Sequence, residues 1–377
     1  MNAIGIIFSS INEKSIHELT KERTMASVPF GCRYRLIDFA LSNMVNAGIT
    51  HIGLITHYNY QSLMDHIGTG KDWDLARRHG GIKLLPPYIT AFSNATNTIG
   101  STWLGALVNV RDFLNGCKEE YVVLSDCDSV CNLDLDAMIQ QHISLGSDVT
   151  LAVKRVYIAD GGHHRSVTVI DSDENGMITG VADSAGRPSG YADASLKLVV
   201  ANKKYIENSI NLATAYGYSD FYKDVILRGK DASDCRIYRY ENYFATLRSL
   251  NDYFSCSMDL LDPEIRRSLF GLRSRPVLTK VRNSAPSSYV NGSVVRNSLI
   301  ADGCVIEGTV ENSIIFRGVK VGKNTTVKNC ILMQDTITGD NAYLNCVITE
   351  KNVVIREGRV LSGHETMPFF IEKNAIV

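Results

Sequence analysis

Two stretches of the sequence lie where an α/β protein would place its chemistry. The apolar run at residues 4–8 ends in the polar segment SSINEKSIHEL, and the run EEYVVLSDCD at 119–128 ends in acidic residues. Ligands of parallel sheets bind beyond the carboxyl ends of the strands, so both segments are candidates for a binding site. The carboxylates of Asp126 and Asp128 are of the kind that Mg²⁺ prefers as ligands.

The first of these loops has the place of a phosphate-binding loop without its residues. Glycines let the backbone N–H groups of such a loop approach a phosphate closely. Between Phe8 and Leu19 there is no glycine, and Glu13 adds a charge that repels phosphate. The sequence therefore predicts that this loop does not hold a nucleotide in the usual way.

The elements that must position these loops follow two different apolar periods. Residues 1–250 alternate strands with helices, such as the helical pattern at 36–48 and the strand pattern at 49–57, which predicts an α/β domain with a mostly parallel sheet. Beyond residue 290, apolar residues recur every six positions with Gly or Asn between them. They are Val294, Ile300 and Ile306, and then Ile315, Val321 and Val327.

A six-residue repeat of this kind is typical of a left-handed parallel β-helix, and a β-sandwich with short strands is the alternative. We therefore expect a nucleotide-binding-like domain over 1–250, a helical linker over 251–285 and a β-helix over 286–377. Solenoids of this type offer flat faces that serve assembly or regulation.

Composition excludes several classes of partner. The chain has 377 residues and a formal net charge of -1, so no overall field draws it to nucleic acid or to an anionic membrane. No stretch is long and apolar enough for a membrane span, and no signal peptide is recognised. Nine cysteines, an odd number scattered through a large chain, indicate reduced thiols in the cytoplasm.

Four segments resemble the ADP-glucose pyrophosphorylases (glucose-1-phosphate adenylyltransferases), which make ADP-glucose from ATP and glucose 1-phosphate for glycogen or starch synthesis. They are VPFGCRYRLIDFALSN (28–43), HIGTGKDWDL (66–75), GGIKLLPPY (80–88) and MDLLDPEI (258–265). The order of segments also matches, so the resemblance covers essentially the whole chain. It implies a Rossmann-like nucleotidyltransferase domain followed by a left-handed β-helix.

In catalytic members of that family, a sugar phosphate attacks the α-phosphorus of ATP, and catalysis comes from positioning and charge neutralisation. The family's G-G-x-G-x-R loop falls here on Ser10, Ile11, Asn12, Glu13, Lys14 and Ser15, so its glycines and arginine are missing. The lysine of R-x-K-P falls on Met25, although Arg23 keeps the arginine.

The metal and sugar-phosphate motifs are altered as well. The family's S-G-D-H is similar to residues 125–128, with Cys127 at the metal aspartate between two carboxylates, and an apparent insertion before Asp134 leaves that register open. The E-K-P that holds the sugar phosphate corresponds to residues 186–188, with Arg187 at the lysine. The second metal aspartate falls on Thr246.

These losses resemble a branch of the family whose members are non-catalytic or weakly catalytic partners of a catalytic, GlgC-type subunit. We therefore expect no catalytic residue, no metal and no cofactor on this chain, with Mg²⁺ in the catalytic partner and a heterotetrameric assembly, and self-association remains open. The degenerate positions are Ser10, Ile11, Glu13, Ser15, Met25, Cys127 and Thr246. The candidates for vestigial ligand binding are Arg23, Asp126, Asp128 and Arg187.

Simpler interpretations remain open for these residues. Asp126 and Asp128 could be exposed polar residues at a strand end, and Arg187 a solvated loop charge. Arg23, Arg33 and Arg35 could form an anion site or pair with carboxylates. The rival functions are an active sugar-phosphate nucleotidyltransferase with substituted ligands and, on the β-helix alone, an acyltransferase, for which we find no histidine within the coils.

Overall fold

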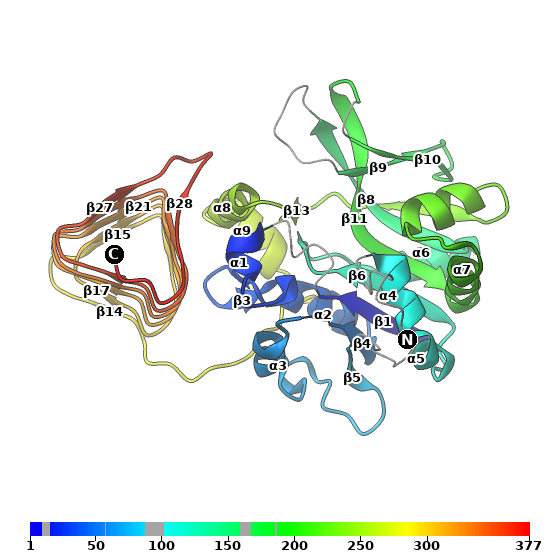
Figure 1. The fold of residues 1–377 in the computed structure, drawn as a ribbon, viewed down its shortest axis with the longest axis horizontal. Helices are drawn as coiled ribbons and strands as arrows, with labels where there is room; N and C mark the ends of the chain where they lie inside the picture. Colours follow the sequence, from blue (N-terminus) through cyan, green and yellow to red (C-terminus); the bar gives the residue numbers. More distant parts are fainter. Residues whose placement is uncertain (10–15, 57, 87–101, 159–166, 185–186) are drawn as a thin grey trace.

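The computed structural model describes residues 1–9, 16–56, 58–86, 102–158, 167–184 and 187–377. It has two regions that correspond to the two apolar periods (Figure 1). Among the described residues, no helix combines the length and the apolar character needed to cross a membrane. All nine cysteines are free and buried, as the sequence predicts for reduced thiols.

A nine-stranded sheet forms the centre of the first region. Its order is β10-β9-β11-β6-β1-β4-β5, with β8 beside β11 and β12 beside β8. β10 and β11 run opposite to the other strands, so the sheet is mostly parallel. The strands are β1 (Ala3–Phe8), β4 (His51–Ile55), β5 (Gly81–Leu85), β6 (Tyr121–Asp126), β8 (Val149–Ile158), β9 (Thr168–Ser172), β10 (Ile178–Asp183), β11 (Gly190–Asn202) and β12 (Cys235–Arg239).

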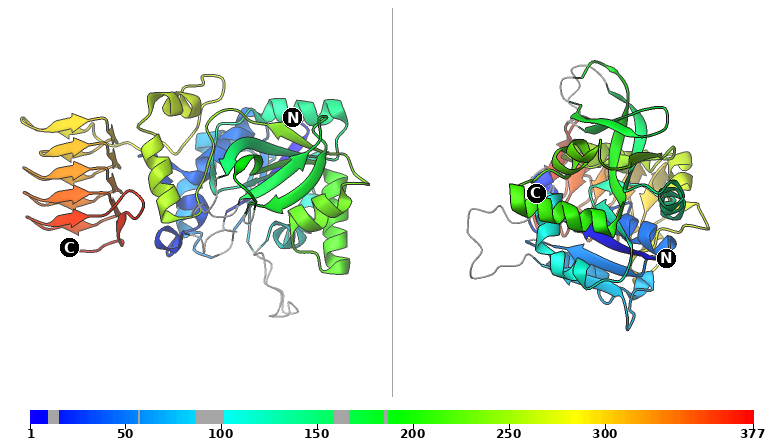
Figure 2. Two further views of the ribbon diagram at one scale, coloured as in Figure 1. Left: turned by 90° about the horizontal axis from the view of Figure 1, so that it is seen from above. Right: turned by 90° about the vertical axis from the view of Figure 1, so that its right-hand side faces the viewer.

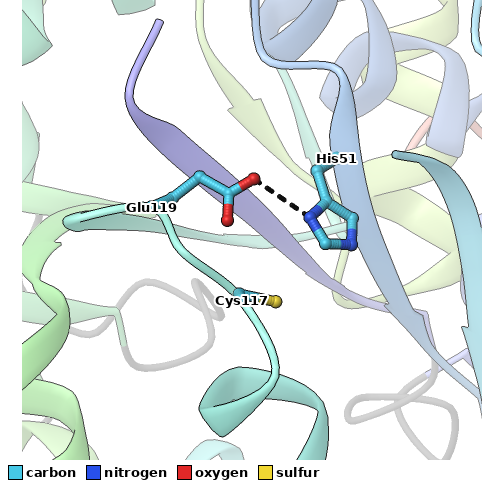
Figure 3. A group of neighbouring side chains, drawn as sticks. All are labelled: His51, Cys117 and Glu119. Carbon is cyan, nitrogen blue, oxygen red and sulfur yellow. Dashed lines mark hydrogen bonds and ion pairs between the residues drawn. The ribbon is translucent and has the colours of Figure 1, made fainter. Parts of the chain in front are cut away.

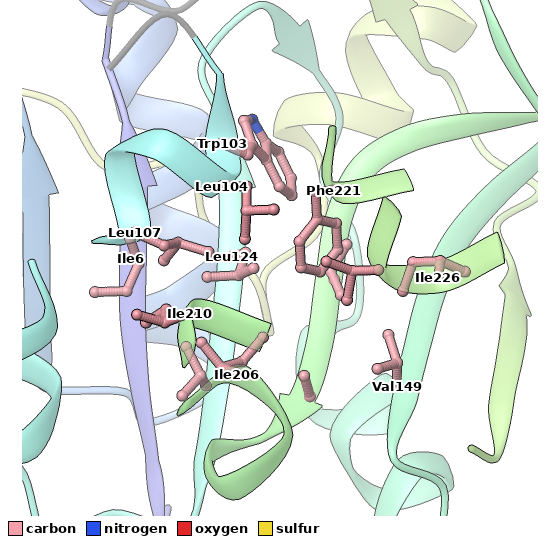
Figure 4. Close-up of a cluster of buried hydrophobic side chains, with 14 of the residues drawn as sticks. Ile6, Trp103, Leu104, Leu107, Leu124, Val149, Ile206, Ile210, Phe221 and Ile226 are labelled. Atoms are coloured by element: carbon pink, nitrogen blue, oxygen red, sulfur yellow. The ribbon is translucent and has the colours of Figure 1, made fainter. Parts of the chain in front are cut away.

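Helices cover both faces of this sheet because the apolar side chains of its strands alternate between them. Ile6 and Leu124 point into one core with Leu107 (Figure 4), whereas Ile7 and Val123 point into the other. The helices are α1 (His17–Thr20), α2 (Leu36–Asn46), α3 (Gln61–Ile67), α4 (Trp103–Asn109), α5 (Arg111–Asn115), α6 (Leu135–Leu145), α7 (Lys203–Tyr216), α8 (Leu250–Asp259) and α9 (Pro263–Phe270). Shorter turns are η2 (Met25–Ser27), η3 (Lys71–Trp73) and the π-helical η4 (Phe221–Leu227).

Helix α2 shows how local chemistry sets these elements. Its first turn is fixed because the Asp38 carboxylate accepts the backbone N–H of Arg35 at 3.0 Å. It ends before Gly48, which adopts a left-handed φ of 74°. The predicted helix at 36–48 is thereby confirmed. Two short pairs complete the region, β2 (Pro29–Phe30) with β3 (Tyr34–Arg35) and β7 (Ser129–Val130) with β13 (Ala245–Thr246).

The second region is a left-handed β-helix of three parallel sheets with five strands each, stacked coil upon coil (Figure 2). The six-residue period is confirmed at Ile306, Ile315, Val321 and Val327, which fill its interior, and Ile300 packs against them. The prediction is wrong at Val294, because the neighbouring Val295, in register with the buried Val310, packs against this core instead. The sheets are β14 (Ser288–Tyr289), β17 (Val305–Ile306), β20 (Lys320–Val321), β23 (Ile337–Thr338) and β26 (Val354–Ile355); β15 (Val294–Arg296), β18 (Thr309–Glu311), β21 (Thr326–Lys328), β24 (Tyr343–Asn345) and β27 (Val360–Ser362); and β16 (Leu299–Ile300), β19 (Ile314–Ile315), β22 (Ile331–Leu332), β25 (Val347–Thr349) and β28 (Phe369–Ile371).

Asparagines occupy corner positions of the β-helix, where the backbone is left-handed. Asn297, Asn312 and Asn329 occupy equivalent corners with φ of 40°, 44° and 49°. Asn is among the few residues that adopt this left-handed conformation readily. The Asn297 amide donates to the Asn312 side chain at 2.8 Å, which links successive coils.

The two regions are joined by a shared apolar core. Phe30 and Leu36 from the first region pack in one cluster with Ile314 and Ile331 of the β-helix and with Tyr253 of α8. The Tyr253 hydroxyl also donates to the Pro29 carbonyl at 2.8 Å. Figure 1 shows α1, β3, α8 and α9 on the side of the sheet that faces the β-helix. The helical linker therefore buries its apolar side chains within the chain.

A buried ion pair crosses this joint. The Arg23 guanidinium contacts both carboxylate oxygens of Glu350, one of them at 2.8 Å, and both side chains are about 5% exposed. Lys21 pairs with Glu372 at 3.1 Å at the exposed rim of the same contact. Each pair connects the segment after α1 to the last coils of the β-helix.

We predict that Glu350→Ala lowers the free energy of unfolding by about 3 kcal/mol, because it leaves the Arg23 charge buried and unpaired. Glu372→Ala is the matched control, since its exposed pair contributes about 0–1 kcal/mol. Denaturant unfolding followed by circular dichroism measures both. Equal effects of the two substitutions would show that burial of the Arg23 pair does not stabilise the joint.

Candidate functional site

The candidate site lies at the carboxyl edge of β1 and β6. These strands are paired in parallel with Phe8 opposite Asp126, so the loop after β1 and the acidic residues after β6 begin side by side. The degenerate loop positions Ser10, Ile11, Glu13 and Ser15 lie outside the described residues. What the structure describes at this edge is the acidic pair and its surroundings.

Asp126 and Asp128 are buried and hold a lysine between them. Their exposed fractions are 6% and 0%, so the expectation of exposed polar residues at a strand end is wrong. The Lys197 amine lies 3.3 Å from an Asp126 carboxylate oxygen and 2.5 Å from one of Asp128. The loop folds inward here because the ion pairs compensate the cost of removing both carboxylates from water.

The electrostatics of this cluster follow from its burial. Burial and the neighbouring charge of Asp128 raise the pKa of Asp126 to about 6. Burial alone would lower the pKa of Lys197, but the charges of Asp128 and Asp126 outweigh it and raise that pKa. The lysine is therefore a cation at neutral pH.

Lys197 reaches this position through an irregularity in β11. The register between β11 and β8 shifts between Ser195 and Val199, and Lys197 there adopts a φ of 53°. A left-handed conformation costs a side-chain-bearing residue roughly 1–2 kcal/mol. The Ser195 hydroxyl accepts the Lys197 backbone N–H at 3.1 Å and contacts the Tyr222 hydroxyl at 3.0 Å.

The short strand pair β7–β13 lies beside the cluster of Asp126, Asp128 and Lys197. Thr246 lies opposite Ser129 in this pair, and the Leu247 backbone N–H donates to the Asp128 carbonyl at 2.7 Å. The next residue, Arg248, is close enough for its charge to act on Lys197. Thr246 thus lies close to the acidic pair and offers a hydroxyl rather than a carboxylate.

Cys127 and Met25 face protein cores. Cys127 is fully buried in the core that contains Val123, whereas Asp126 and Asp128 both contact the Lys197 amine. Burial and the charge of Asp126 raise the pKa of the Cys127 thiol, which keeps it neutral. Met25 is 1% exposed among apolar residues of the interdomain core. Both positions are closed to a ligand.

Arg187 and Arg23, the other two candidates for vestigial ligand binding, are paired with carboxylates away from this site. Arg187 forms a two-pronged contact with Asp171 of β9, at 3.0 and 2.5 Å, which raises the pKa of the guanidinium. The β9–β10 hairpin projects from the main sheet (Figure 1). Arg23 is the buried partner of Glu350. The structure therefore brings Asp126 and Asp128 together and gives Arg23 and Arg187 structural partners.

Mg²⁺ does not fit the described residues of this site. The Lys197 amine already lies between the two carboxylates that would have to hold the ion. Neither Cys127, which faces a core, nor Thr246 supplies a further carboxylate. Mg²⁺ requires near-octahedral oxygen ligands at about 2.1 Å, and an ammonium group in that space opposes it.

A second candidate site lies between the two regions and is strongly basic. Among the residues that the structure describes, five basic side chains line it: Arg33, Arg35, Arg282, Arg317 and Lys351. None of the described residues that line it is acidic. Arg33 and Arg35 are the arginines that the sequence marks for an anion site, whereas the other three come from the linker and the β-helix.

The crowding of cations perturbs their protonation. Burial together with Arg35 and Arg23 lowers the pKa of Lys351 to about 7. Burial and Arg23 lower the pKa of Arg35 to about 10. Burial and Arg282 likewise lower the pKa of Arg317. A bound anion would relieve this repulsion, so the pocket has the chemistry of an anion site.

One group of potential metal ligands, His51, Cys117 and Glu119, lies near the amino-terminal ends of β4 and β6 (Figure 3). His51 Nδ1 contacts a Glu119 carboxylate oxygen at 3.0 Å, and the Cys117 thiol donates to the Phe113 carbonyl at 3.0 Å. Burial and Glu119 raise the pKa of Cys117 to about 11, so it stays a thiol. The contacts are those of a histidine–carboxylate hydrogen bond beside a cysteine whose thiol has its own acceptor.

Comparisons with known proteins match both regions. Residues 6–182 match the family model described as nucleotidyl transferase, and residues 285–367 match the one described as GlmU-like, C-terminal hexapeptide. The chain is 32% identical over 374 residues to glycogen biosynthesis protein GlgD of Bacillus subtilis (strain 168), covering 99% of this chain and 96% of the relative.

Two further relatives are similar. GlgD of Geobacillus stearothermophilus is 35% identical over 376 residues, which cover 99% of this chain and 96% of that protein. A glucose-1-phosphate adenylyltransferase of Halalkalibacterium halodurans is 32% identical over 332 residues, which cover 86% of this chain and 83% of that protein.

We predict that sulfate binds the basic pocket and that its affinity falls, by up to about tenfold, as pH rises from 6.5 to 8.5. The reason is that Lys351, with its pKa lowered to about 7, loses its charge over this range, whereas sulfate stays a dianion. Isothermal titration calorimetry measures the affinity at each pH. Lys351→Gln should bind more weakly and lose most of the pH dependence, and Lys320→Gln, on an exposed strand position, should behave like the wild type. An unchanged pH dependence in Lys351→Gln would contradict the assignment.

Proposed function

The chain belongs to the glucose-1-phosphate adenylyltransferase family, which includes the GlgD proteins of glycogen biosynthesis, and from this premise we propose that it is a regulatory subunit of ADP-glucose synthesis. In this proposal the chain assembles with a catalytic, GlgC-type subunit in the cytoplasm and raises its activity. It has little or no activity of its own and needs no cofactor, and the catalytic partner holds the Mg²⁺.

One observation carries the proposal: a lysine amine lies between the two carboxylates at the edge where the family's chemistry would occur. Nucleotidyl transfer builds up negative charge on phosphate oxygens, and metal ions neutralise it. Met25 and Cys127 are buried in cores and cannot contribute. A loss of several such groups, each contributing a few kcal/mol, lowers the rate by many orders of magnitude.

The basic pocket supports the regulatory part of the proposal. It is built from both regions, and its cations come from β3 and the residue before it, the linker and two coils of the β-helix. An anionic effector bound there would contact both regions at once. The effector response of the assembled enzyme would then depend on this chain.

The outer faces of the β-helix support assembly. Tyr343 and Val360 lie opposite each other on neighbouring strands, and their side chains are 41% and 71% exposed. Together they present apolar surface on a flat sheet, which is a feature of protein contact surfaces. We propose this face for contact with the catalytic subunit.

An assay of ADP-glucose synthesis tests the proposal. We expect the chain alone to give no turnover with ATP, glucose 1-phosphate and Mg²⁺, and we expect a mixture with the catalytic subunit to exceed the catalytic subunit alone. Tyr343→Asp/Val360→Asp should weaken the stimulation, since it places charge on the proposed contact face. Glu311→Asp on β18, two strands away from β24 in the same sheet, is the control and should leave it unchanged.

Robust turnover by the chain alone would instead favour an active nucleotidyltransferase with substituted ligands. Asp126→Asn and Asp128→Asn would then be the first variants to assay. Two separate species by analytical ultracentrifugation of the mixture, with no stimulation, would contradict the regulatory proposal.

A further inference from the structure

The lysine at the acidic pair has a role beyond neutralising buried charge. We infer that Lys197 is a built-in cation that occupies the divalent-metal position between Asp126 and Asp128 and keeps metal ions out of it. The inferred role concerns metal binding at this acidic pair in the isolated chain. It rests on the proposed function only for its setting, a family whose chemistry uses metal.

Geometry places the amine in the space a metal would need. Its nitrogen lies 2.5 Å from an oxygen of Asp128 and 3.3 Å from an oxygen of Asp126. A metal held by both carboxylates would lie within the same few ångströms and would be repelled by the ammonium group. The two cations therefore compete for one position.

The backbone of β11 is irregular at Lys197, and this irregularity brings the amine to the carboxylates. Lys197 is in the left-handed region at a φ of 53°, where glycine would sit without strain. Strained conformations persist only where the surrounding structure holds them. Here the Ser195 hydroxyl accepts the Lys197 backbone N–H at 3.1 Å, and the buried carboxylates hold its side chain.

The charges at the site also match those of a metal centre. Among the residues that the structure describes here, Asp126 and Asp128 supply two negative charges, and Lys197 and Arg248 supply two positive charges, the number a divalent ion would bring. Arg248 directly follows Leu247, whose backbone N–H donates to the Asp128 carbonyl at 2.7 Å, so this segment lies beside the cluster. A divalent ion added to this set would leave an excess positive charge in a buried site.

Lys197→Gly tests the inference, because it removes the amine and lets the backbone keep its φ without strain. Manganese serves as the probe, with electron paramagnetic resonance counting free Mn²⁺ in titrations of the full-length chain. We expect the wild type to show no binding that depends on Asp128. We expect Lys197→Gly to bind about one equivalent, at least tenfold more tightly than the wild type.

Two further variants control for dependence on Asp128 and for unfolding of Lys197→Gly. Lys197→Gly/Asp128→Asn should lose the acquired binding, since one carboxylate ligand is gone. Lys197→Met retains the apolar stem of the lysine and should also acquire a site, so it replaces the glycine variant if that chain unfolds. Mn²⁺ should raise the melting temperature of the Lys197 variants by several degrees and leave that of the wild type unchanged.

The inference is overturned by either of two results. One is a Mn²⁺ site in the wild type that disappears in Asp128→Asn. The other is a folded Lys197 variant, shown by circular dichroism, that binds Mn²⁺ no better than the wild type. Neither result requires the catalytic subunit or measures turnover, so each leaves the proposed regulatory function to its own assay.

Discussion

The structure depends on keeping one charged pair out of water at the contact between its two regions. Arg23 and Glu350 come from sequence positions more than three hundred residues apart, and each would be a buried, unpaired charge without the other. The apolar cluster around Phe30 and Ile314 excludes water from the same contact. Separation of the regions would therefore expose apolar surface and break the pair together. This constraint fixes where the β-helix lies against the sheet and so brings the walls of the basic pocket together.

Buried charges are also neutralised within the chain at the carboxyl edge of the central sheet. Two carboxylates follow β6 in a fold that places ligands at such edges, and the chain neutralises them with its own side chains. Lys197 reaches them only because β11 shifts its register and bends into a left-handed conformation. Among the described residues of this edge, the two carboxylates are thus neutralised by a lysine of the same chain.

The sequence predicts the framework well because periodicity reports burial directly. The helix ending before Gly48 and the interior positions Ile315 and Val327 of the β-helix are found as predicted, since apolar spacing alone identifies their buried face. The candidate site is predicted less completely. Asp126 and Asp128 are correctly placed at the strand end, but their burial depends on a lysine about seventy residues away.

The local sequence around a charged residue does not indicate which distant side chain it pairs with. Lys197 lies in a strand pattern that gives no hint of a bulge, and Arg187 pairs with Asp171 although a loop arginine is usually solvated. Arg282, Arg317 and Lys351 become neighbours of Arg35 only after the two regions pack together. A single sequence contains the charges, but the packing decides which of them meet.

Glu350 and Lys351 are consecutive residues, and this adjacency links the joint between the regions to the basic pocket. Glu350 holds Arg23, its carboxylate accepts the Lys351 backbone N–H at 3.0 Å, and the Lys351 side chain lines the pocket. A rotation of the β-helix relative to the sheet would move Lys351 and Arg317 away from Arg35 while it strained the Arg23 pair. An anion bound in the pocket would therefore be coupled to the angle between the regions and would favour the angle at which its affinity is higher.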